Sequence, residues 1–188
     1  MIIMENTGLK RGYLELEGYR EDYPSIYEKA KDELLEIYGN RIKYIDHVGS
    51  TSIKNIISKP IIDINIQTDD LDDFIKYTES KVEGEVYTVK KEPTMGGDYL
   101  IRKEEDGKVK AFIHVYKTGD WNYTRVVLFR DYLNSHEEER KRYQELKMVL
   151  FDKCKDNETR KEYTLGKDDY IKRIVSLALN EKEKKSDN

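Results

Sequence analysis

The spacing of hydrophobic residues changes along the chain from helical to alternating and back to helical. Between residues 24 and 38, apolar side chains recur at the spacing of one helix face, and Gly39-Asn40 ends the run. Pro24 stands where a helix tolerates proline, in its first turn. This pattern predicts a helix over about 24–38.

Alternating or continuous apolar runs predict strands at 41–47, 60–67 and 85–89, and a hairpin made of 99–102 and 109–116. The hairpin turn contains Asp106-Gly107, a pair that favours the positive backbone angles of a tight turn. Before the third strand, Asp69-Asp70 precedes Leu71 and Phe74 and predicts the start of an acidic helix.

After Trp121 the helical spacing returns and continues almost to the C-terminus. Ser135 is the predicted N-cap of a helix from 136 to about 154. Thr159, with Glu162 three residues later, is the predicted capping box of a helix that ends near 180. The charged residues 181–188 are expected to fray.

This order of elements predicts an α+β fold, with a small mixed β-sheet flanked by helices and a helical C-terminal layer. A length of 188 residues suits a single domain spanning 1–188. We expect its α/β part at about 15–120 and its helical part at about 121–180.

Composition limits the class of protein. The net charge is −4 and the basic residues are dispersed, which disfavours a large nucleic-acid footprint. One cysteine excludes an internal disulfide, and three histidines with one cysteine disfavour a structural zinc site. No segment approaches the ~20 apolar residues of a membrane span. We therefore expect a reduced, cytoplasmic protein that contacts no membrane, and the oligomeric state stays open.

The segment from His47 to Ile66 carries the candidate chemistry. Glycine lets the backbone approach an anion closely, so the Gly49-Ser50 turn can direct N–H groups of Ser50 and Thr51 at a phosphate. The hydroxyls of Ser50, Thr51 and Ser52 add further donors. The alternative is a tight turn that only joins two strands.

Asp63 and Asn65 are the polar residues of the Ile-rich strand, and their spacing places them on one face. A buried carboxylate is costly unless it meets a partner or a cation. Magnesium takes oxygen ligands from few protein groups, so Asp63 and Asn65 are candidate metal ligands, Asn65 offering a neutral oxygen. The alternative is an edge strand whose polar face meets solvent.

Four other residues are candidates for the same site. Lys59 precedes Pro60 and is within reach of a phosphate at the turn, or it only solvates the loop. His114 would face Asp63 if its strand adjoins the strand at 60–67, as a metal ligand, a base or an orienting group. Tyr163 and Lys167 are one helical turn apart and could hold a base and a phosphate, or belong to an ordinary surface.

Arg130 and Asp131 are expected to pair within the helical layer.

Several motifs together resemble the GrpB family, in the same order and over about residues 15–180. They are His47 to Ser52, Lys59 to Ile64, Phe129 to Leu133, Tyr143 to Lys147, and Tyr163-Thr164 with Lys167. That family is assigned to the nucleotidyltransferase superfamily, whose fold resembles the catalytic domain of DNA polymerase beta. The resemblance implies transfer of a nucleoside monophosphate from a triphosphate to an acceptor, with magnesium as cofactor.

By the same resemblance, Gly49 and Ser50 would hold the triphosphate and Asp63 would be the first metal ligand. Asn65 stands where the superfamily has its second carboxylate, and the third falls on the strand at 110–116, where this chain has Phe112 and His114. Two-metal catalysis depends on such anionic ligands. The alternative function is therefore a catalytically degenerate module that binds or senses a nucleoside triphosphate or another phosphorylated small molecule.

Overall fold

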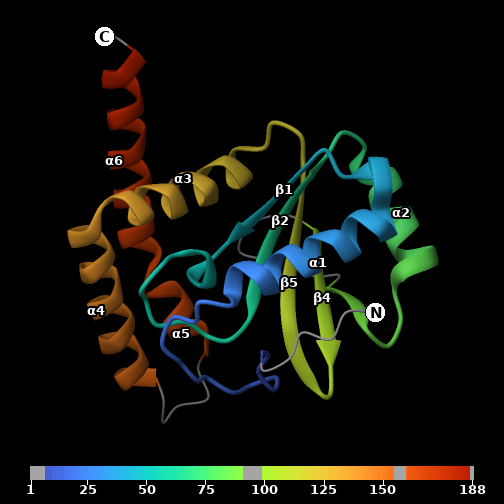
Figure 1. The fold of residues 1–188 in the computed structure, drawn as a ribbon, viewed down its shortest axis with the longest axis horizontal. Coiled ribbons are helices and arrows are strands. Elements are labelled where there is room, and N and C mark those ends of the chain that lie inside the picture. Colours follow the sequence, from blue (N-terminus) through green and yellow to red (C-terminus); the bar gives the residue numbers. More distant parts are fainter. Residues whose placement is uncertain (1–6, 91–98, 155–159, 187–188) are drawn as a thin grey trace.

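The computed structural model describes residues 7–90, 99–154 and 160–186 (Figure 1). Its strands form one sheet in the order β1-β2-β5-β4-β3. Their bounds are β1 Tyr44–Val48, β2 Ile62–Thr68, β3 Tyr87–Lys90, β4 Tyr99–Glu105 and β5 Lys108–Lys117. β2 and β5 run parallel, and the other neighbouring pairs run antiparallel, so the sheet is mixed as predicted.

The helices flank this sheet in two groups (Figure 1). Their bounds are α1 Tyr23–Tyr38, α2 Leu71–Tyr77, α3 Trp121–Ser135, α4 Glu137–Cys154, α5 Arg160–Leu165 and α6 Asp168–Ser186. α1 packs on β1 and β2, and α2 packs on β5. The last four helices form a C-terminal layer beside β1. The α+β prediction is therefore confirmed at the level of a mixed sheet with helices.

One face of β2 belongs to the main core. Ile62, Ile64 and Ile66 are fully buried and pack with the apolar face of α1. Burying each such side chain contributes about 1.5–3 kcal/mol. Because successive strand residues alternate in direction, Asp63 and Asn65 are presented on the opposite face.

A second core fixes the segment that follows the Gly49 turn. Ile53 and Ile56 are buried among Phe129 and Leu133 of α3, Tyr143 of α4, and Ile174 and Val175 of α6. The loop is thereby held against the C-terminal helices, which places those helices over the polar face of β2.

Two local predictions are confirmed by backbone geometry. Asp106 and Gly107 have positive φ angles of 53° and 70° in the hairpin between β4 and β5. Asp70 caps α2, because its carboxylate accepts a hydrogen bond of 2.9 Å from the N–H of Asp73.

The predicted N-cap at Ser135 is wrong, although the helix it was meant to begin is present. Ser135 is the last residue of α3, and its hydroxyl donates back to the carbonyl of Asp131 at 2.8 Å. α4 begins at Glu137, one residue after His136. Serine satisfies helix carbonyls as readily as it caps amides, so its position alone did not decide between the two. Thr159 lies outside the described residues.

The predicted single helix ending near 180 is two helices, α5 and α6, separated by Gly166-Lys167. Gly166 packs tightly on α4, where an added Cβ would lie 2.5 Å from Cδ2 of Leu150. Residues 181–186, which were expected to fray, continue α6. Lys185 pairs with Glu181 there at 2.7 Å, one helical turn away.

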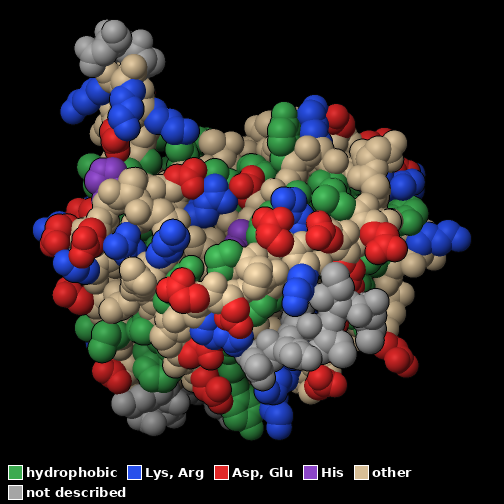
Figure 2. Space-filling model, viewed as in Figure 1, with side chains coloured by type: hydrophobic (Ala, Val, Ile, Leu, Met, Phe, Trp, Pro, Cys, Tyr) green, Lys and Arg blue, Asp and Glu red, His purple; other side chains and the backbone are tan. Residues whose placement is uncertain are grey.

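The surface carries charges of both signs. On the face shown in Figure 2, acidic and basic side chains are interspersed, and lysine and arginine side chains surround the projecting end of α6. Within the described ranges, no helix combines the length and the apolar character needed to cross a membrane.

Candidate functional site

The polar face of the sheet opens into a cleft with two adjoining cavities. The first, the lysine lobe, measures about 290 Å³ and is lined by Ser50, Lys59, Asp63, Lys147, Tyr163 and Lys167 among others. The second, the Asn65 lobe, measures about 340 Å³ and includes Gly49, Asp63, Asn65, Tyr116, Arg125 and Asp168. Asp63, His114 and Thr164 line both, so the two lobes meet at these residues.

The turn after β1 passes directly against Asp63. Val48 pairs with Asp63 in the ladder between β1 and β2, so Gly49 follows immediately beside the carboxylate. Gly49 has φ 69° and ψ −169°, and a Cβ there would lie 2.2 Å from Asp63 Oδ2. Only glycine fits this backbone conformation and this contact. The structure therefore brings Gly49 and Asp63 together, and their shared role in a site stays a prediction.

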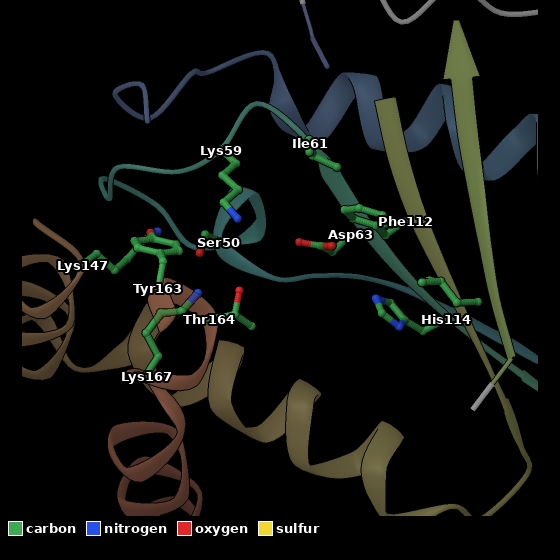
Figure 3. A pocket seen from close by; sticks show the side chains of 11 residues that line it. Ser50, Lys59, Ile61, Asp63, Phe112, His114, Lys147, Tyr163, Thr164 and Lys167 are labelled. Carbon is green, nitrogen blue, oxygen red and sulfur yellow. The ribbon is translucent and has the colours of Figure 1, made fainter. Parts of the chain in front are cut away.

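Three lysines surround the carboxylate of Asp63. Burial raises the pKa of Asp63 to about 6, against the opposing effects of Lys59, Lys167 and Lys147. Figure 3 shows the amines of Lys59 and Lys167 directed into the same space as the carboxylate. Three amines near one carboxylate favour an anionic ligand.

The lysines are themselves partly desolvated. Burial lowers the pKa of Lys167 to about 8, although Asp63 and Asp168 raise it. Burial also lowers the pKa of Lys147 well below its usual range, and the nearby charges of Lys167 and Lys59 lower it further. Lys147 is 1% exposed, and its amine donates to the carbonyl of Ile57. An incoming anion would favour the charged form of each amine.

The ring of Tyr163 holds two of these lysines together. The Nζ atoms of Lys59 and Lys167 lie 5.0 Å and 4.4 Å from the ring centroid. Tyr163 belongs to α5 and Lys167 to the turn before α6, so the break at Gly166 brings the amine back over the ring. Tyr163 and Lys167 share one lobe, as the sequence predicted, but they do not share one helix.

Two of the predicted phosphate-binding hydroxyls face elsewhere. Ser50, Thr51 and Ser52 form a short 3-10 turn. The Ser52 hydroxyl donates to the Gly49 carbonyl at 2.7 Å, and the Thr51 hydroxyl lies 2.9 Å from Nε2 of His47. Ser50 lines the lysine lobe, whereas neither Thr51 nor Ser52 lines either lobe. The latter two side chains fix the turn instead.

Arg130 fastens the helical layer to the strand that leads into this turn. Its NH1 atom lies 3.0 Å from Asp46 Oδ1 and donates to the His47 carbonyl at 2.7 Å. Arg130 also pairs with Asp131 at 2.7 Å, as expected, but the contacts to β1 were not predicted. Tyr123 completes the arrangement by donating to the other oxygen of Asp46.

Asn65 and His114 are adjacent across the parallel pair of strands β2 and β5. The condition under which His114 would share a face with Asp63, that the two strands adjoin, is therefore met. Burial lowers the pKa of His114 to about 4, so its ring is neutral at pH 7. Asn65 is 1% exposed, and its Nδ2 has no hydrogen-bond partner within the described part of the chain.

Comparisons with known proteins agree with this organisation. The family model described as GrpB protein matches residues 13–176, which is most of the chain. The chain belongs to the GrpB family. Glutamate-rich protein GrpB of Alkalihalophilus pseudofirmus is 30% identical over 173 residues, a match that covers 90% of this chain and 98% of that protein.

Other members of the GrpB family differ in length. UPF0157 protein YqkA of Bacillus subtilis is 33% identical over 154 residues, which cover 82% of this chain but 44% of YqkA, so the chain spans less than half of that relative. The crystal structure of conserved protein GrpB from Enterococcus faecalis has a TM-score of 0.75 at 24% identity, covering 89% of this chain and 98% of that one. This likeness establishes the shared fold.

Magnesium fits the donor set of this GrpB-family site poorly. At the junction of the lobes the cleft offers the carboxylate of Asp63, with Asn65 beside it and three lysines around it, and the carboxylate of Asp168 lines only the Asn65 lobe. Among the described residues, no three His, Cys, Asp or Glu side chains are grouped so as to hold a metal ion. Magnesium prefers several oxygen ligands, and the positive charges of the adjacent lysine ammonium groups repel a magnesium ion.

Lys147 and Arg125 line the cleft without having been predicted to do so from the sequence. Lys147 follows Tyr143 by one helical turn, and both are buried on α4. A lysine at the spacing of the apolar face was a usable signal, because buried lysines are rare without a partner. Arg125 had no comparable signal, since its position depends on how α3 crosses the sheet.

Proposed function

We propose that this protein binds a nucleotide or another phosphorylated small molecule, with the phosphate groups in the lysine lobe. The observation that carries the proposal is the gathering of Lys59, Lys147 and Lys167 around Asp63 in one cavity. Ammonium groups are effective ligands for phosphate, and in a partly desolvated cavity their attraction for an anion is stronger than in water.

The Gly49-Ser50 turn supports the same proposal. It brings backbone against the rim of the cleft without an intervening side chain, and Ser50 lines the lysine lobe. The position of the Gly49-Ser50 turn beside Asp63, together with the mixed sheet, supports a nucleotidyltransferase-like fold, which we also propose. We keep the cytoplasmic location as a proposal from the composition.

Transfer of a nucleoside monophosphate to an acceptor, with magnesium, stays a prediction from the family resemblance. The contact between Gly49 and Asp63 is what favours it. Apart from Asp168, which lines only the Asn65 lobe, the rest of the donor set is basic or neutral, so we favour a binding module over a two-metal enzyme.

Thermal unfolding with ATP, GTP, CTP, UTP and pyrophosphate, each with magnesium or with EDTA, tests the proposal. A ligand that binds the native state raises the melting temperature. We expect stabilisation in EDTA by at least one of these compounds. No shift with any compound in either condition would reject the phosphate site, and a shift that requires magnesium would favour the transferase.

A further inference from the structure

The Asn65 lobe contains two N–H groups with unmet hydrogen-bonding capacity. Asn65 Nδ2 and Arg125 Nε have no hydrogen-bond partner in the part of the chain that the structure describes. Both residues line this lobe, and Asn65 is 1% exposed. An unpaired buried donor destabilises the fold, so such donors around a cavity indicate where a ligand places an acceptor.

The guanidinium group of Arg125 makes an anionic acceptor the best match for this lobe. Arg125 and Lys172 are its cations, and Asp168 is the carboxylate that it does not share with the lysine lobe. Asp63 belongs to both lobes, and Lys59 and Lys167 of the lysine lobe oppose its charge. A guanidinium group matches a carboxylate in geometry as well as in charge, because two N–H groups meet two oxygens.

The remaining walls limit the size of the occupant. Val48, Val126 and Ile171 are apolar, and the lobe has a volume of about 340 Å³. The apolar walls keep water from competing for Asn65 and Arg125. The hydrogen bonds of these residues to a small polar group are therefore stronger than they would be in water.

We infer that the Asn65 lobe binds a carboxylate of the same molecule whose phosphate occupies the lysine lobe. The ligand is then a small phosphorylated carboxylic acid. The lobes meet at Asp63, His114 and Thr164, so a short link joins the two anionic ends. Asp63 and His114 are suited to accept hydrogen bonds from a hydroxyl on that link. This inference rests on the phosphate site proposed above.

A matched pair of probes tests the carboxylate. 3-Phosphoglycerate and glycerol 3-phosphate share a phosphate and a hydroxyl and differ by a carboxylate in place of a hydroxymethyl group. In EDTA we expect the protein to bind 3-phosphoglycerate at least about tenfold more tightly by calorimetry. Asn65→Asp and Arg125→Gln should each abolish this preference, by lowering the affinity for 3-phosphoglycerate more than the affinity for glycerol 3-phosphate.

Asn40→Asp is the control for the added charge, since Asn40 is exposed, and it should keep the preference. If Asn65→Asp does not fold, Arg125→Gln alone decides. Equal affinities for the two probes, or a preference that survives both substitutions, would overturn the carboxylate inference while leaving the phosphate site. Tighter, Asn65-dependent binding of uridine 5′-monophosphate would also overturn it, by assigning the lobe to a base carbonyl. Binding of no probe would reject the phosphate proposal itself.

Discussion

Gly49 and Asp63 are packed so closely that the position of one depends on the other. An added Cβ on Gly49 would lie 2.2 Å from Oδ2 and 2.8 Å from Cγ of Asp63. The turn and the carboxylate come from adjacent antiparallel strands, so the sheet register itself sets their contact. This contact fixes the rim of the cleft on which both lobes depend.

Gly49→Ala should destabilise the protein more than an alanine at another glycine with positive φ. Gly119 has φ 87° and open space where its Cβ would be, so Gly119→Ala measures backbone strain alone, about 1–2 kcal/mol. Gly49→Ala adds the clash with Asp63, about 1–3 kcal/mol more. Urea unfolding of both variants gives the comparison, and equal losses would mean that Asp63 moves aside freely.

Arg130→Gln should lower the free energy of unfolding by about 1–3 kcal/mol, because it leaves partly buried Asp46 without its cation. The control is Lys31→Gln, which removes an exposed pair with Glu28 on α1 and should cost less than about 0.5 kcal/mol. Chemical denaturation measures both. A loss at Arg130 no larger than that at Lys31 would show that α3 is held to β1 by other contacts.

The aromatic ring of Tyr163, rather than its hydroxyl, should support anion binding. Tyr163→Phe keeps the ring beside Lys59 and Lys167 and should bind pyrophosphate within about twofold of the wild type. Tyr163→Leu removes the ring and should weaken binding about tenfold. Calorimetric titration distinguishes the two. Equal affinities of the Phe and Leu variants would contradict a role for the ring.

Anion affinity should fall with rising pH in two steps. As pH rises through about 6, Asp63 ionises and adds a negative charge to the lobe. As it rises through about 8, Lys167 loses its proton and a positive charge disappears. Sulfate keeps its charge over this range, so its affinity between pH 5 and pH 10 reports the protein alone.

Lys167→Arg should remove the upper of these two steps, because a guanidinium stays protonated over the whole range. A drop near pH 8 that persists in this variant would assign the drop to a group other than Lys167.

The strands of the sheet, and the site residues that lie on them, could be predicted because the local alternation of apolar and polar residues specifies both. The Ile-rich alternation at 61–66 placed Asp63 and Asn65 on one face, and the strand at 110–116 brought in His114. Side chains placed by long-range packing were not predicted. Arg125 reaches the cleft through the packing of α3 on β1 and β2, which no local spacing encodes, and Lys147 reaches it through the packing of α4 on α3 and α5.

The turn residues show the same limit at a smaller scale. Ser50, Thr51 and Ser52 are adjacent and chemically similar, so the sequence predicted the same role for all three hydroxyls, as donors to a phosphate. The 3-10 turn separates them, since it leaves Ser50 at the lysine lobe and directs Thr51 toward His47. Such a separation depends on one turn of backbone geometry.

Calorimetric titration of pyrophosphate in EDTA, with the wild type and three lysine variants, measures whether the lysine lobe binds an anion without a metal. Lys54 lies on the same loop as Lys59 but is exposed, so Lys54→Gln makes the same charge change outside the cleft. We expect saturable binding by the wild type and Lys54→Gln, and affinities at least about tenfold lower for Lys59→Gln and Lys167→Gln. Two results would contradict anion binding in the lysine lobe. The first is wild-type protein that does not bind pyrophosphate without a metal, and the second is Lys59 and Lys167 variants that bind it as tightly as the wild type.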